Sequence, residues 1–453
     1  MTKDPAWALA EHVCGVGFDA LPETTRAATR HEMLDTFGCL LGGSGAPGID
    51  TLVQVLGRWG GLAESQVMLS GLRLPAPTAA LINASMAHAL DFDDTLDHGG
   101  SIHPGASVLG ASLATADALG GVSGADLMLA VALGLDVSCR VALASTLDRG
   151  WHRTAAMGVF GAAAAAGKLL GLTVPQMVNA FGIAFSQAAG NRQCIVDGAL
   201  TKRLQAGQAA SSGVLAAMLA REGFTGAENV FLGRFGFFEL YQPNGYDAAR
   251  LTAGLGVQFT GEQLSFKPYP CGRPQHAILD AAIAVRGQLG LTTTQAGGRI
   301  AGVCVSADAG TVADQFAGAA HKRRPRQIVE AQFALPFLVA AALTHGRVGI
   351  GEVGAIDDAA VLALADRIEG RAVDGAGGVS VTLDDGRSAA VAAGAPLGSP
   401  ENRLSVAQLE AKFADCARNA VRPIADDTIA QAVQMFRTLE TVETSSALLQ
   451  LFV

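Results

Sequence analysis

Apolar residues recur every three or four positions from residue 5 to about residue 262, which is the spacing of one face of an α-helix. Helices are predicted over residues 5–43, 78–90, 108–145, 153–171, 174–189 and 201–222. Gly120 and Gly121 interrupt the third of these stretches, and Ser123 or Gly124 can cap the helix that follows. No segment of this region alternates like a strand, so the pattern predicts a large all-helical domain.

The pattern changes at Lys267-Pro-Tyr-Pro-Cys-Gly-Arg-Pro274, where three prolines prevent a helix from continuing. Beyond it, residues 299–306 alternate as a strand, and two β-type runs around Asp385-Gly386 predict a hairpin over residues 378–391. Helices are predicted over residues 275–288, 327–344 and 357–368. Residues 265–396 are therefore predicted to form a smaller α+β domain.

Helical periodicity returns at residues 405–414 and 426–441. These helices can pack back onto the first domain, which would make the α+β domain an insertion. The predicted fold class is mainly α with an α+β second domain: residues 1–264 and 397–453 form the helical domain and residues 265–396 the α+β domain. A length of 453 residues also fits two domains better than one core.

The amino-acid composition indicates which kinds of partner the protein can bind. Half of the residues are hydrophobic but only 6% are aromatic, and such an excess of small apolar surface favours an oligomer, most simply a homodimer. The net charge of −9 disfavours nucleic acid as a partner, and the basic run at residues 321–326 is interpreted as a solvated loop.

The cellular location of the protein is predicted from its N-terminus, its apolar stretches and its cysteines. The N-terminal residues contain no apolar signal core. The longest uncharged stretch, Leu169–Asn191, has 23 residues, but Pro175 breaks it, so it predicts a pair of buried helices and no membrane span. Seven scattered cysteines without a CxxC motif indicate reduced thiols and a cytoplasmic protein.

The densest polar segment is residues 88–104, which hold four carboxylates and three of the nine histidines. If the preceding helix persists, His88, Asp91 and Thr95 share one face. Gly99-Gly100 then breaks the helix, and the chain returns at His103-Pro104. An aspartate that accepts a hydrogen bond from a histidine fixes its tautomer and favours proton transfer near neutral pH. Asp97 is interpreted as solvated.

The same segment spells Asp93-Asp94-Thr-Leu-Asp97, a DDxxD pattern that in terpenoid synthases binds magnesium and diphosphate. That chemistry also needs an aromatic cavity and a second metal motif, whereas this chain has three Trp and three Tyr. No HExxH or HxH motif accompanies the aspartates. No metal site is therefore predicted.

Cationic side chains downstream are candidates for binding an anion. His152 precedes a helix that Thr154 can cap, and Lys202 lies in the first turn of another helix, where a cation is unfavourable unless an anion compensates it. Lys267 lies on the proline-stiffened segment at the domain junction. His276 is a candidate for substrate binding, while Cys271 lacks the local signature of a thiol nucleophile.

Together these motifs resemble the MmgE/PrpD family, which includes 2-methylcitrate dehydratase, cis-aconitate decarboxylase and iminodisuccinate epimerase. The matches run in order along the chain: His88-Ala-Leu-Asp-Phe-Asp-Asp-Thr95, His103-Pro104, Gly150-Trp-His152, Gly161-Ala-Ala-Ala-Ala-Ala-Gly-Lys168, Thr201-Lys202 with Ala206-Gly207, Lys267-Pro-Tyr-Pro-Cys271 and Glu330-Ala-Gln-Phe333. The chain departs from the family at Ala331-Gln-Phe-Ala334, where Lys-Phe-Ser is common, and no tyrosine matches the pocket tyrosine of the decarboxylase branch.

The resemblance implies a helical domain made from both ends of the chain, an α+β lid domain and a homodimer that needs no metal or organic cofactor. It implies a site formed by matching residues: Asp91, Thr95, His103, His152, Lys202 and Lys267.

The predicted function is a cofactor-free lyase, a dehydratase or decarboxylase, acting on a small di- or tricarboxylate such as 2-methylcitrate or cis-aconitate. Lys202 and Lys267 would hold carboxylates and stabilise enolate charge, and His103 or His152 would move the proton. Asp91 would orient its partner histidine, and Thr95 would hold a carboxylate or water. An epimerase of a small dicarboxylate and a non-catalytic polycarboxylate-binding protein remain as alternatives.

Overall fold

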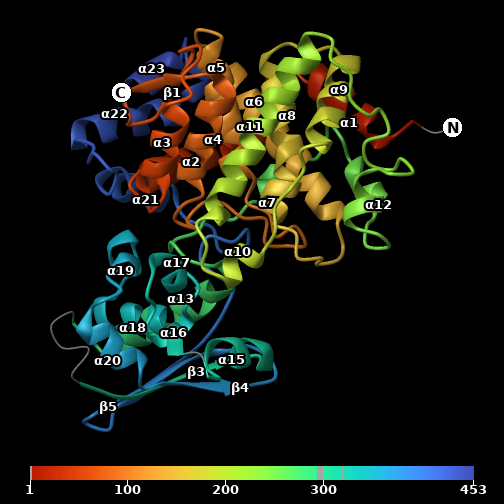
Figure 1. Ribbon diagram of the computed structural model, residues 1–453. Coiled ribbons are helices and arrows are strands. Elements are labelled where there is room, and N and C mark those ends of the chain that lie inside the picture. The colour runs from red at the N-terminus through yellow and green to blue at the C-terminus, as the bar shows by residue number, and fades with distance from the viewer. Residues whose placement is uncertain (1–2, 293–298, 319) are drawn as a thin grey trace. The chain divides into compact units, whose positions relative to one another are not determined.

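The computed structural model describes residues 3–292, 299–318 and 320–453, which form two compact units (Figure 1). The first unit comprises Met1–Ala89, Asp93–Phe266 and Ser405–Val453, and the second comprises Leu90–Phe92 and Lys267–Leu404. The mainly helical class with an α+β second part is confirmed. The units change at residues 266/267 and 404/405, and the sequence placed the domain boundaries at 264/265 and 396/397.

The first unit is a helical assembly in which α4, α5, α6, α8 and α11 contact one another. Its α-helices are α1 (Pro5–Gly15), α2 (Glu23–Gly43), α3 (Ile49–Gly57), α4 (Ala76–Ala87), α5 (Pro104–Ala118), α6 (Gly124–Ala144), α7 (Arg153–Ala156), α8 (Gly158–Leu169), α9 (Val174–Phe185), α10 (Gln193–Val196), α11 (Thr201–Arg221), α12 (Phe237–Tyr241), α21 (Val406–Arg418), α22 (Asp426–Arg437) and α23 (Ser446–Gln450). Short 3-10 helices lie at Phe18–Ala20, Ala248–Leu251, Thr260–Gln263 and Leu439–Thr441.

Small residues let these helices approach closely. A Cβ at Gly161 of α8 would lie 1.9 Å from the Ser138 hydroxyl of α6. A Cβ at Gly207 of α11 would lie 2.3 Å from the Leu81 carbonyl oxygen of α4. Neither distance is compatible with a side chain, so these glycines fix how near α8 comes to α6 and α11 to α4. The composition, rich in glycine and poor in aromatic residues, follows from this packing.

Several predicted boundaries in this unit need correction. Two short strands, β1 (Ser65–Val67) and β2 (Leu72–Leu74), pair antiparallel in the region predicted to lack strands. The helix predicted over residues 153–171 is divided into α7 and α8 at Met157, where the backbone leaves helical geometry with φ −112°. The predicted cap is confirmed, because the Ser123 hydroxyl accepts a hydrogen bond from the Asp126 amide at 3.0 Å.

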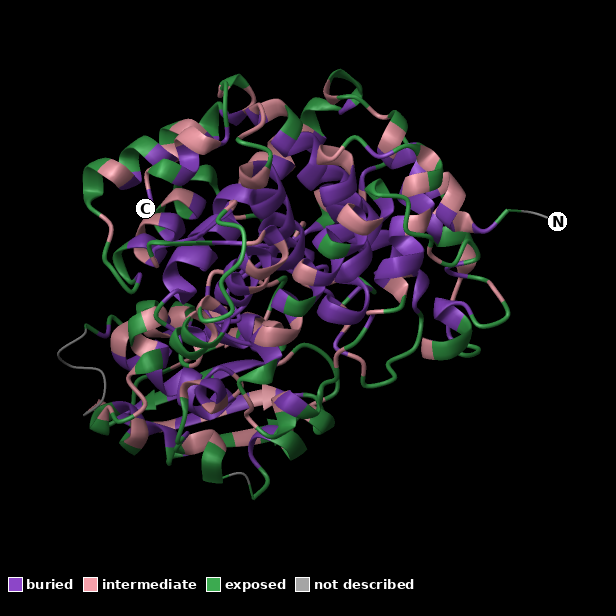
Figure 2. Cartoon of the chain, turned by 45° about the horizontal axis from the view of Figure 1, so that its top comes forward, coloured by how far each residue is buried: buried purple, intermediate pink, exposed green. Residues whose placement is uncertain are grey.

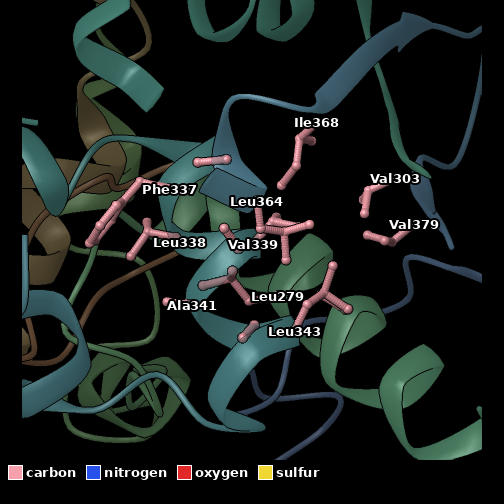
Figure 3. Packing of buried hydrophobic residues seen from close by; sticks show 14 of the residues in the cluster. Leu279, Val303, Phe337, Leu338, Val339, Ala341, Leu343, Leu364, Ile368 and Val379 are labelled. Atoms are coloured by element: carbon pink, nitrogen blue, oxygen red, sulfur yellow. The ribbon is translucent and has the colours of Figure 1, made fainter. Parts of the chain in front are cut away.

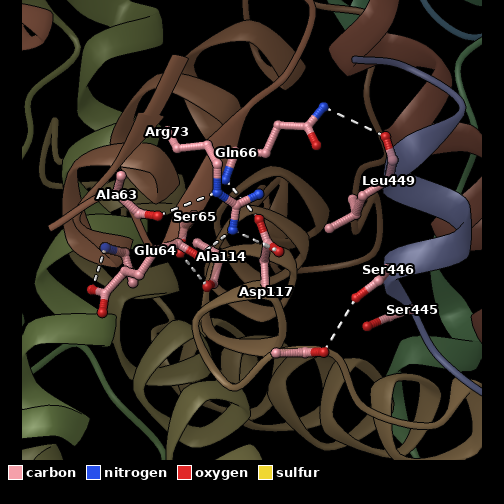
Figure 4. Close-up of polar contacts among 12 residues, drawn as sticks. Ala63, Glu64, Ser65, Gln66, Arg73, Ala114, Asp117, Ser445, Ser446 and Leu449 are labelled. Atoms are coloured by element: carbon pink, nitrogen blue, oxygen red, sulfur yellow. Dashed lines mark hydrogen bonds and ion pairs between the residues drawn. The ribbon is translucent and has the colours of Figure 1, made fainter. Parts of the chain in front are cut away.

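The C-terminal segment returns to the first unit, as the periodicity suggested. Figure 4 shows contacts that hold it there: the Gln66 amide donates to the carbonyl of Leu449, and the Ser446 hydroxyl donates to the carbonyl of Gly120. The Gln66 backbone amide donates to the Asp117 carboxylate at 2.7 Å.

The second unit has a four-stranded mixed sheet of order β4-β3-β5-β6. Strand β3 (Ile300–Ala307) pairs parallel with β4 (Ile368–Ala372) and antiparallel with β5 (Gly378–Leu383), and β5 pairs antiparallel with β6 (Ser388–Ala392). The hairpin predicted around Asp385-Gly386 is confirmed. Strand β4 was not predicted. The helix predicted over residues 357–368 is shorter in the structure, where it ends at Ala365, and residue 368 belongs to β4.

Helices cover this sheet. They are α13 (His276–Gln288), α15 (Ala309–Gln315), α16 (Ala320–Arg323), α17 (Ile328–Ala331), α18 (Leu335–His345), α19 (Ile350–Gly354) and α20 (Ala359–Ala365), with a 3-10 turn at Arg273–Gln275. Leu279 of α13, Leu338 of α18 and Val379 of β5 lie in the shared apolar core (Figure 3). The helix predicted over residues 327–344 is divided because Pro336 is tolerated only in the first turn of a helix, and α18 accordingly begins at Leu335.

The basic run at residues 321–326 is tied to its own unit and is not simply solvated. Lys322 donates to the Phe333 carbonyl at 2.7 Å, and Arg324 pairs with the Asp366 carboxylate at 2.6 Å.

Among the described residues, one helix, α6, is long and apolar enough to cross a membrane by length and composition. Its apolar window is 94% buried inside the protein, as expected for a core helix, and it contains the ion pair between Asp136 and Arg140. Figure 2 shows buried residues in continuous runs along the inner helices and exposed residues mainly in loops. The uncharged stretch Leu169–Asn191 contains the end of α8, a turn and α9.

Candidate functional site

The polar segment that follows α4 does not continue the helix. Helix α4 ends at Ala87 with His88 as its C-cap, and Asp91 has a positive φ of 53°. The prediction that His88, Asp91 and Thr95 share one helical face is therefore wrong. The segment is instead divided, because Leu90–Phe92 cluster with the second unit and Asp93 onward with the first.

In the first unit, two imidazoles and one ammonium group gather around His88. Its ring centroid lies 5.4 Å from that of His103 and 5.4 Å from that of His152, with which it is stacked at 30°. The Nζ of Lys202 lies 3.0 Å from His88 Nε2. We call these four side chains the histidine cluster. His88, His152 and Lys202 are 1%, 5% and 7% exposed.

Packing brings these residues together from distant parts of the chain. His88 caps the end of α4, and Lys202 lies in the first turn of α11. The close approach of α11 to α4 at Gly207 places the Lys202 ammonium against the His88 ring. His103 and His152 occupy the N-cap positions of α5 and α7.

His88 is held in one tautomer. Its Nδ1 lies 2.6 Å from the Asp93 carboxylate, which can only accept a hydrogen bond when ionised. Nδ1 therefore carries the hydrogen, and Nε2 presents a lone pair to the Lys202 ammonium. Lys202 was predicted to need an anion for compensation. The described arrangement supplies a neutral imidazole acceptor supported by a carboxylate.

His103 is held in the same tautomer by a main-chain carbonyl. Its Nδ1 lies 2.5 Å from the Asp94 carbonyl oxygen, which can only accept, so Nδ1 donates. The His103 backbone amide donates to the Thr154 hydroxyl at 3.1 Å. Thr154 therefore supports the His103 backbone, a role different from the helix cap that its position suggested.

His152 donates from Nδ1 to the side-chain oxygen of Gln205 at 2.9 Å. The orientation of this amide is fixed, because the Asn191 backbone amide donates to the same oxygen at 3.1 Å. Burial lowers the pKa of His152 well below its usual value, and the positive charge of the Lys202 ammonium lowers it further. His152 is therefore a neutral imidazole at neutral pH.

Buried carboxyl groups lie behind the cluster. Asp94 accepts from the Gly105 amide at the start of α5, with oxygen distances of 3.1 and 3.2 Å. Burial raises the pKa of Asp94 well above its usual value, and the nearby carboxyl of Glu32 adds to the effect. Glu32 in turn accepts from the Thr36 hydroxyl at 2.6 Å. Asp35 pairs with a buried lysine of α21, Lys412, at 2.6 Å.

Three of the other predicted site residues, Asp91, Lys267 and His276, lie in the second unit, whereas Thr95 lies in the first. Asp91 and Lys267 are 2% and 0% exposed and form an ion pair at 2.6 Å. Lys267 Nζ also donates to the Asp91 carbonyl oxygen at 3.1 Å. The left-handed backbone of Asp91 is uncommon for a residue with a side chain, although aspartate tolerates it better than most.

His276 was predicted to bind substrate. Both of its ring nitrogens lie within hydrogen-bond distance of residues in the second unit. Nε2 lies 3.2 Å from the Cys271 carbonyl oxygen, and Nδ1 lies 3.2 Å from the Arg273 guanidinium. Burial lowers the pKa of His276 well below its usual value, and Arg273 adds to this. Burial raises the pKa of the Cys271 thiol, with the Asp91 carboxylate as a further cause, so it stays protonated.

The aspartates of the DDxxD pattern have three different roles. Asp93 contacts His88, Asp94 accepts from the start of α5, and Asp97 accepts from the Ser265 hydroxyl at 2.6 Å. Asp97 was expected to be solvated and is half-buried in this contact. Thr95 forms a two-residue β-bridge with Ser265. Within the described ranges, no three His, Cys, Asp or Glu side chains are arranged to hold a metal ion.

Thus His103, His152 and Lys202 come together in the first unit, and Asp91, Lys267 and His276 lie in the second. Sequence reasoning did not include His88 and Asp93 among the site residues, although both belong to the dense polar segment that marked it. Glu32 and Lys412 gave no local signal, because each lies among several other charged residues of its helix and nothing in the spacing singles it out.

Two family models match the chain: the MmgE/PrpD N-terminal domain over residues 7–247 and the MmgE/PrpD C-terminal domain over residues 269–438. A cis-aconitate decarboxylase-like protein of Aspergillus oryzae is 30% identical over 277 residues, which cover 58% of this chain and 57% of that protein. The cis-aconitate decarboxylase of Aspergillus terreus is 27% identical over 355 residues, covering 75% of this chain and 72% of the relative. That of Mus musculus is 31% identical over 301 residues, covering 64% and 60%.

Proposed function

The chain belongs to the MmgE/PrpD family, and we propose that it is a lyase that acts on a small di- or tricarboxylate. The family resemblance of the sequence motifs is confirmed, and relatives with the names of lyases support the reaction class. The observation that carries the proposal is the histidine cluster, in which one ammonium group and three imidazoles lie together, with His103 half-buried and the other three side chains buried.

Each group of the cluster has a task in such a reaction. The Lys202 ammonium binds a substrate carboxylate and stabilises the negative charge that develops on it as an enolate forms. His103 has its Nδ1 hydrogen committed to the Asp94 carbonyl, so its Nε2 is the atom that takes or returns a proton. In a decarboxylation the electrons of the broken C–C bond pass to the enolate as CO₂ leaves, and carbon then receives a proton. In a dehydration a proton leaves carbon and the hydroxyl leaves as water.

The substrate is best found with a panel of acids. Citrate, 2-methylcitrate, cis-aconitate and iminodisuccinate are each incubated with the full chain and followed by proton NMR. Cis-aconitate is included because the relatives from Aspergillus terreus and Mus musculus have the names of its decarboxylases. Loss of water or CO₂ from one of these acids supports the proposal. Deuterium incorporation at the α-carbon without such loss would replace the lyase by an epimerase.

The site assignment is tested by His103→Ala, which should abolish turnover while the circular dichroism spectrum stays unchanged. His321→Ala removes an exposed histidine of the second unit and serves as the matched control, with activity retained. Full activity in the His103 variant would contradict the proposed site.

We also propose that the protein is a homodimer. Large apolar side chains exposed in the single chain support this, among them Trp59, Val196 and Phe235, which are 73%, 78% and 67% exposed. Light scattering that gives the mass of a single chain would contradict it.

A further inference from the structure

His152 has one ring nitrogen that the described part of the protein does not use. Its Nε2 is buried and has no hydrogen-bond partner among the described residues. The side chain as a whole is 5% exposed, so bulk water does not replace the missing partner. Buried polar atoms without a partner are uncommon in folded proteins, and each of them calls for an explanation, such as a catalytic role or a bound water or ion.

The hydrogen-bond network decides what this nitrogen can do. The Gln205 oxygen accepts from both the Asn191 amide and His152 Nδ1, at 3.1 and 2.9 Å. Because that oxygen cannot donate, the His152 hydrogen lies on Nδ1 and Nε2 has a lone pair. The ring stays neutral because it is buried and because the Lys202 ammonium disfavours a second positive charge there. Nε2 is thus a hydrogen-bond acceptor and cannot donate.

A hydrogen-bond acceptor in a site that binds anions discriminates between ligand groups that donate a hydrogen bond and groups that only accept one. Carboxylates are themselves acceptors, so they are suited to the Lys202 ammonium and unsuited to His152 Nε2. A ligand can satisfy Nε2 only with a group that donates, and the simplest such group on a small polycarboxylate is a hydroxyl.

We propose that His152 is a specificity-determining residue whose Nε2 accepts a hydrogen bond from a hydroxyl group of the substrate. This inference rests on the proposed function, because it assumes that the histidine cluster binds a small polycarboxylate. Within that class, the site favours a hydroxy acid over the same carbon skeleton without the hydroxyl. A hydroxyl that fills this position satisfies an atom that the other ligand leaves buried and unpaired, and the affinity should differ by about 10- to 100-fold.

The test uses ligand pairs that differ in one hydroxyl. Citrate and tricarballylate have the same three carboxylates, and malate and succinate have the same two. Isothermal titration of each with the full chain should show tighter binding of the hydroxy acid in at least one pair. Equal affinities within both pairs, or tighter binding of tricarballylate and succinate, would overturn the inference and leave the lyase proposal standing. Failure of all four acids to bind would overturn the inference, and the NMR panel alone would then decide the lyase proposal.

Two variants test whether His152 causes the preference for the hydroxy acid. His152→Leu removes the acceptor, so the ratio of the two affinities should fall to about one while the weaker ligand binds as before. Lys202→Met is the matched control, since it should weaken both members of a pair and preserve their ratio. Circular dichroism and the melting temperature check that each variant is folded. A ratio that persists in His152→Leu would overturn the assignment to His152, and the wild-type comparison stands even where a variant fails to fold.

Discussion

Replacement of Glu32 by glutamine should change how the stability of the protein depends on pH. Glu32 is 2% exposed on α2, and burial raises the pKa of its carboxyl to about 8, with the neighbouring Asp35 carboxylate as a further cause. Its side-chain oxygen accepts from the Thr36 hydroxyl at 2.6 Å, and a glutamine oxygen can accept the same bond. The variant therefore keeps the shape and the hydrogen bond and removes only the ionisation.

The sign and size of the effect follow from the two pKa values. Between the ordinary value of 4.5 and about 8, the folded protein holds a proton that the unfolded chain has released. The free energy of unfolding therefore falls as pH rises through this window, by up to about 1.4 kcal/mol per pH unit. Over the whole window the loss amounts to about 5 kcal/mol, and it is complete above the folded pKa. Glu32→Gln should not show this loss.

Thermal unfolding followed by circular dichroism measures the difference. Between about pH 5.5 and 8.5 the melting temperature of the wild type should fall relative to that of the variant by roughly 3–5 °C. Glu11→Gln, at an exposed position of α1, is the matched control and should follow the wild type. Parallel curves for the wild type and Glu32→Gln would show that Glu32 is already ionised in the folded protein and would refute the reasoning.

Two further substitutions test the packing around the predicted site residues. Lys267→Met should lower the free energy of unfolding by about 3–5 kcal/mol, because it leaves the Asp91 carboxylate buried without its ammonium partner; a loss below about 1 kcal/mol in denaturant titrations would indicate that the pair is solvated. Gly105→Ala would bring a Cβ to 1.9 Å from the Glu32 side-chain oxygen and displace the start of α5, which carries His103. We expect turnover to fall sharply with a smaller loss of stability, and wild-type turnover would show that α5 can shift without consequence.

Much of the fold could be predicted because its signals are local. The helices have apolar spacing along their own sequence, and the hairpin at Asp385-Gly386 is specified by its turn. Strand β4 could not be predicted this way, because Ile368–Ala372 is a strand only through its parallel pairing with β3, more than 60 residues earlier. The end of α4 was missed for a similar reason: no glycine or proline follows Ala87, and tertiary contacts of the next residues end the helix.

The candidate site, like the fold, could be predicted only where its signals are local in the sequence. The dense polar segment marked the region, since its composition is visible in the sequence itself. The roles within it depend on partners that lie far away, such as Lys202, which is 114 residues from His88. The pairing of Asp35 with Lys412 spans 377 residues, and only the return of the C-terminal helices to the first unit makes it possible. Spacing along the chain has no information about such pairs.

The assignment of Leu90–Phe92 to the second unit limits how modular that unit can be. An inserted domain with two adjacent ends can in principle be deleted, or exchanged between homologues, by cutting and rejoining the chain once. Here a chain that joins Phe266 directly to Ser405 would retain Leu90 and Phe92, which are 8% and 3% exposed, after the residues they cluster with had been removed. A functional chimera between two relatives must therefore transfer three residues from the N-terminal half together with the inserted segment.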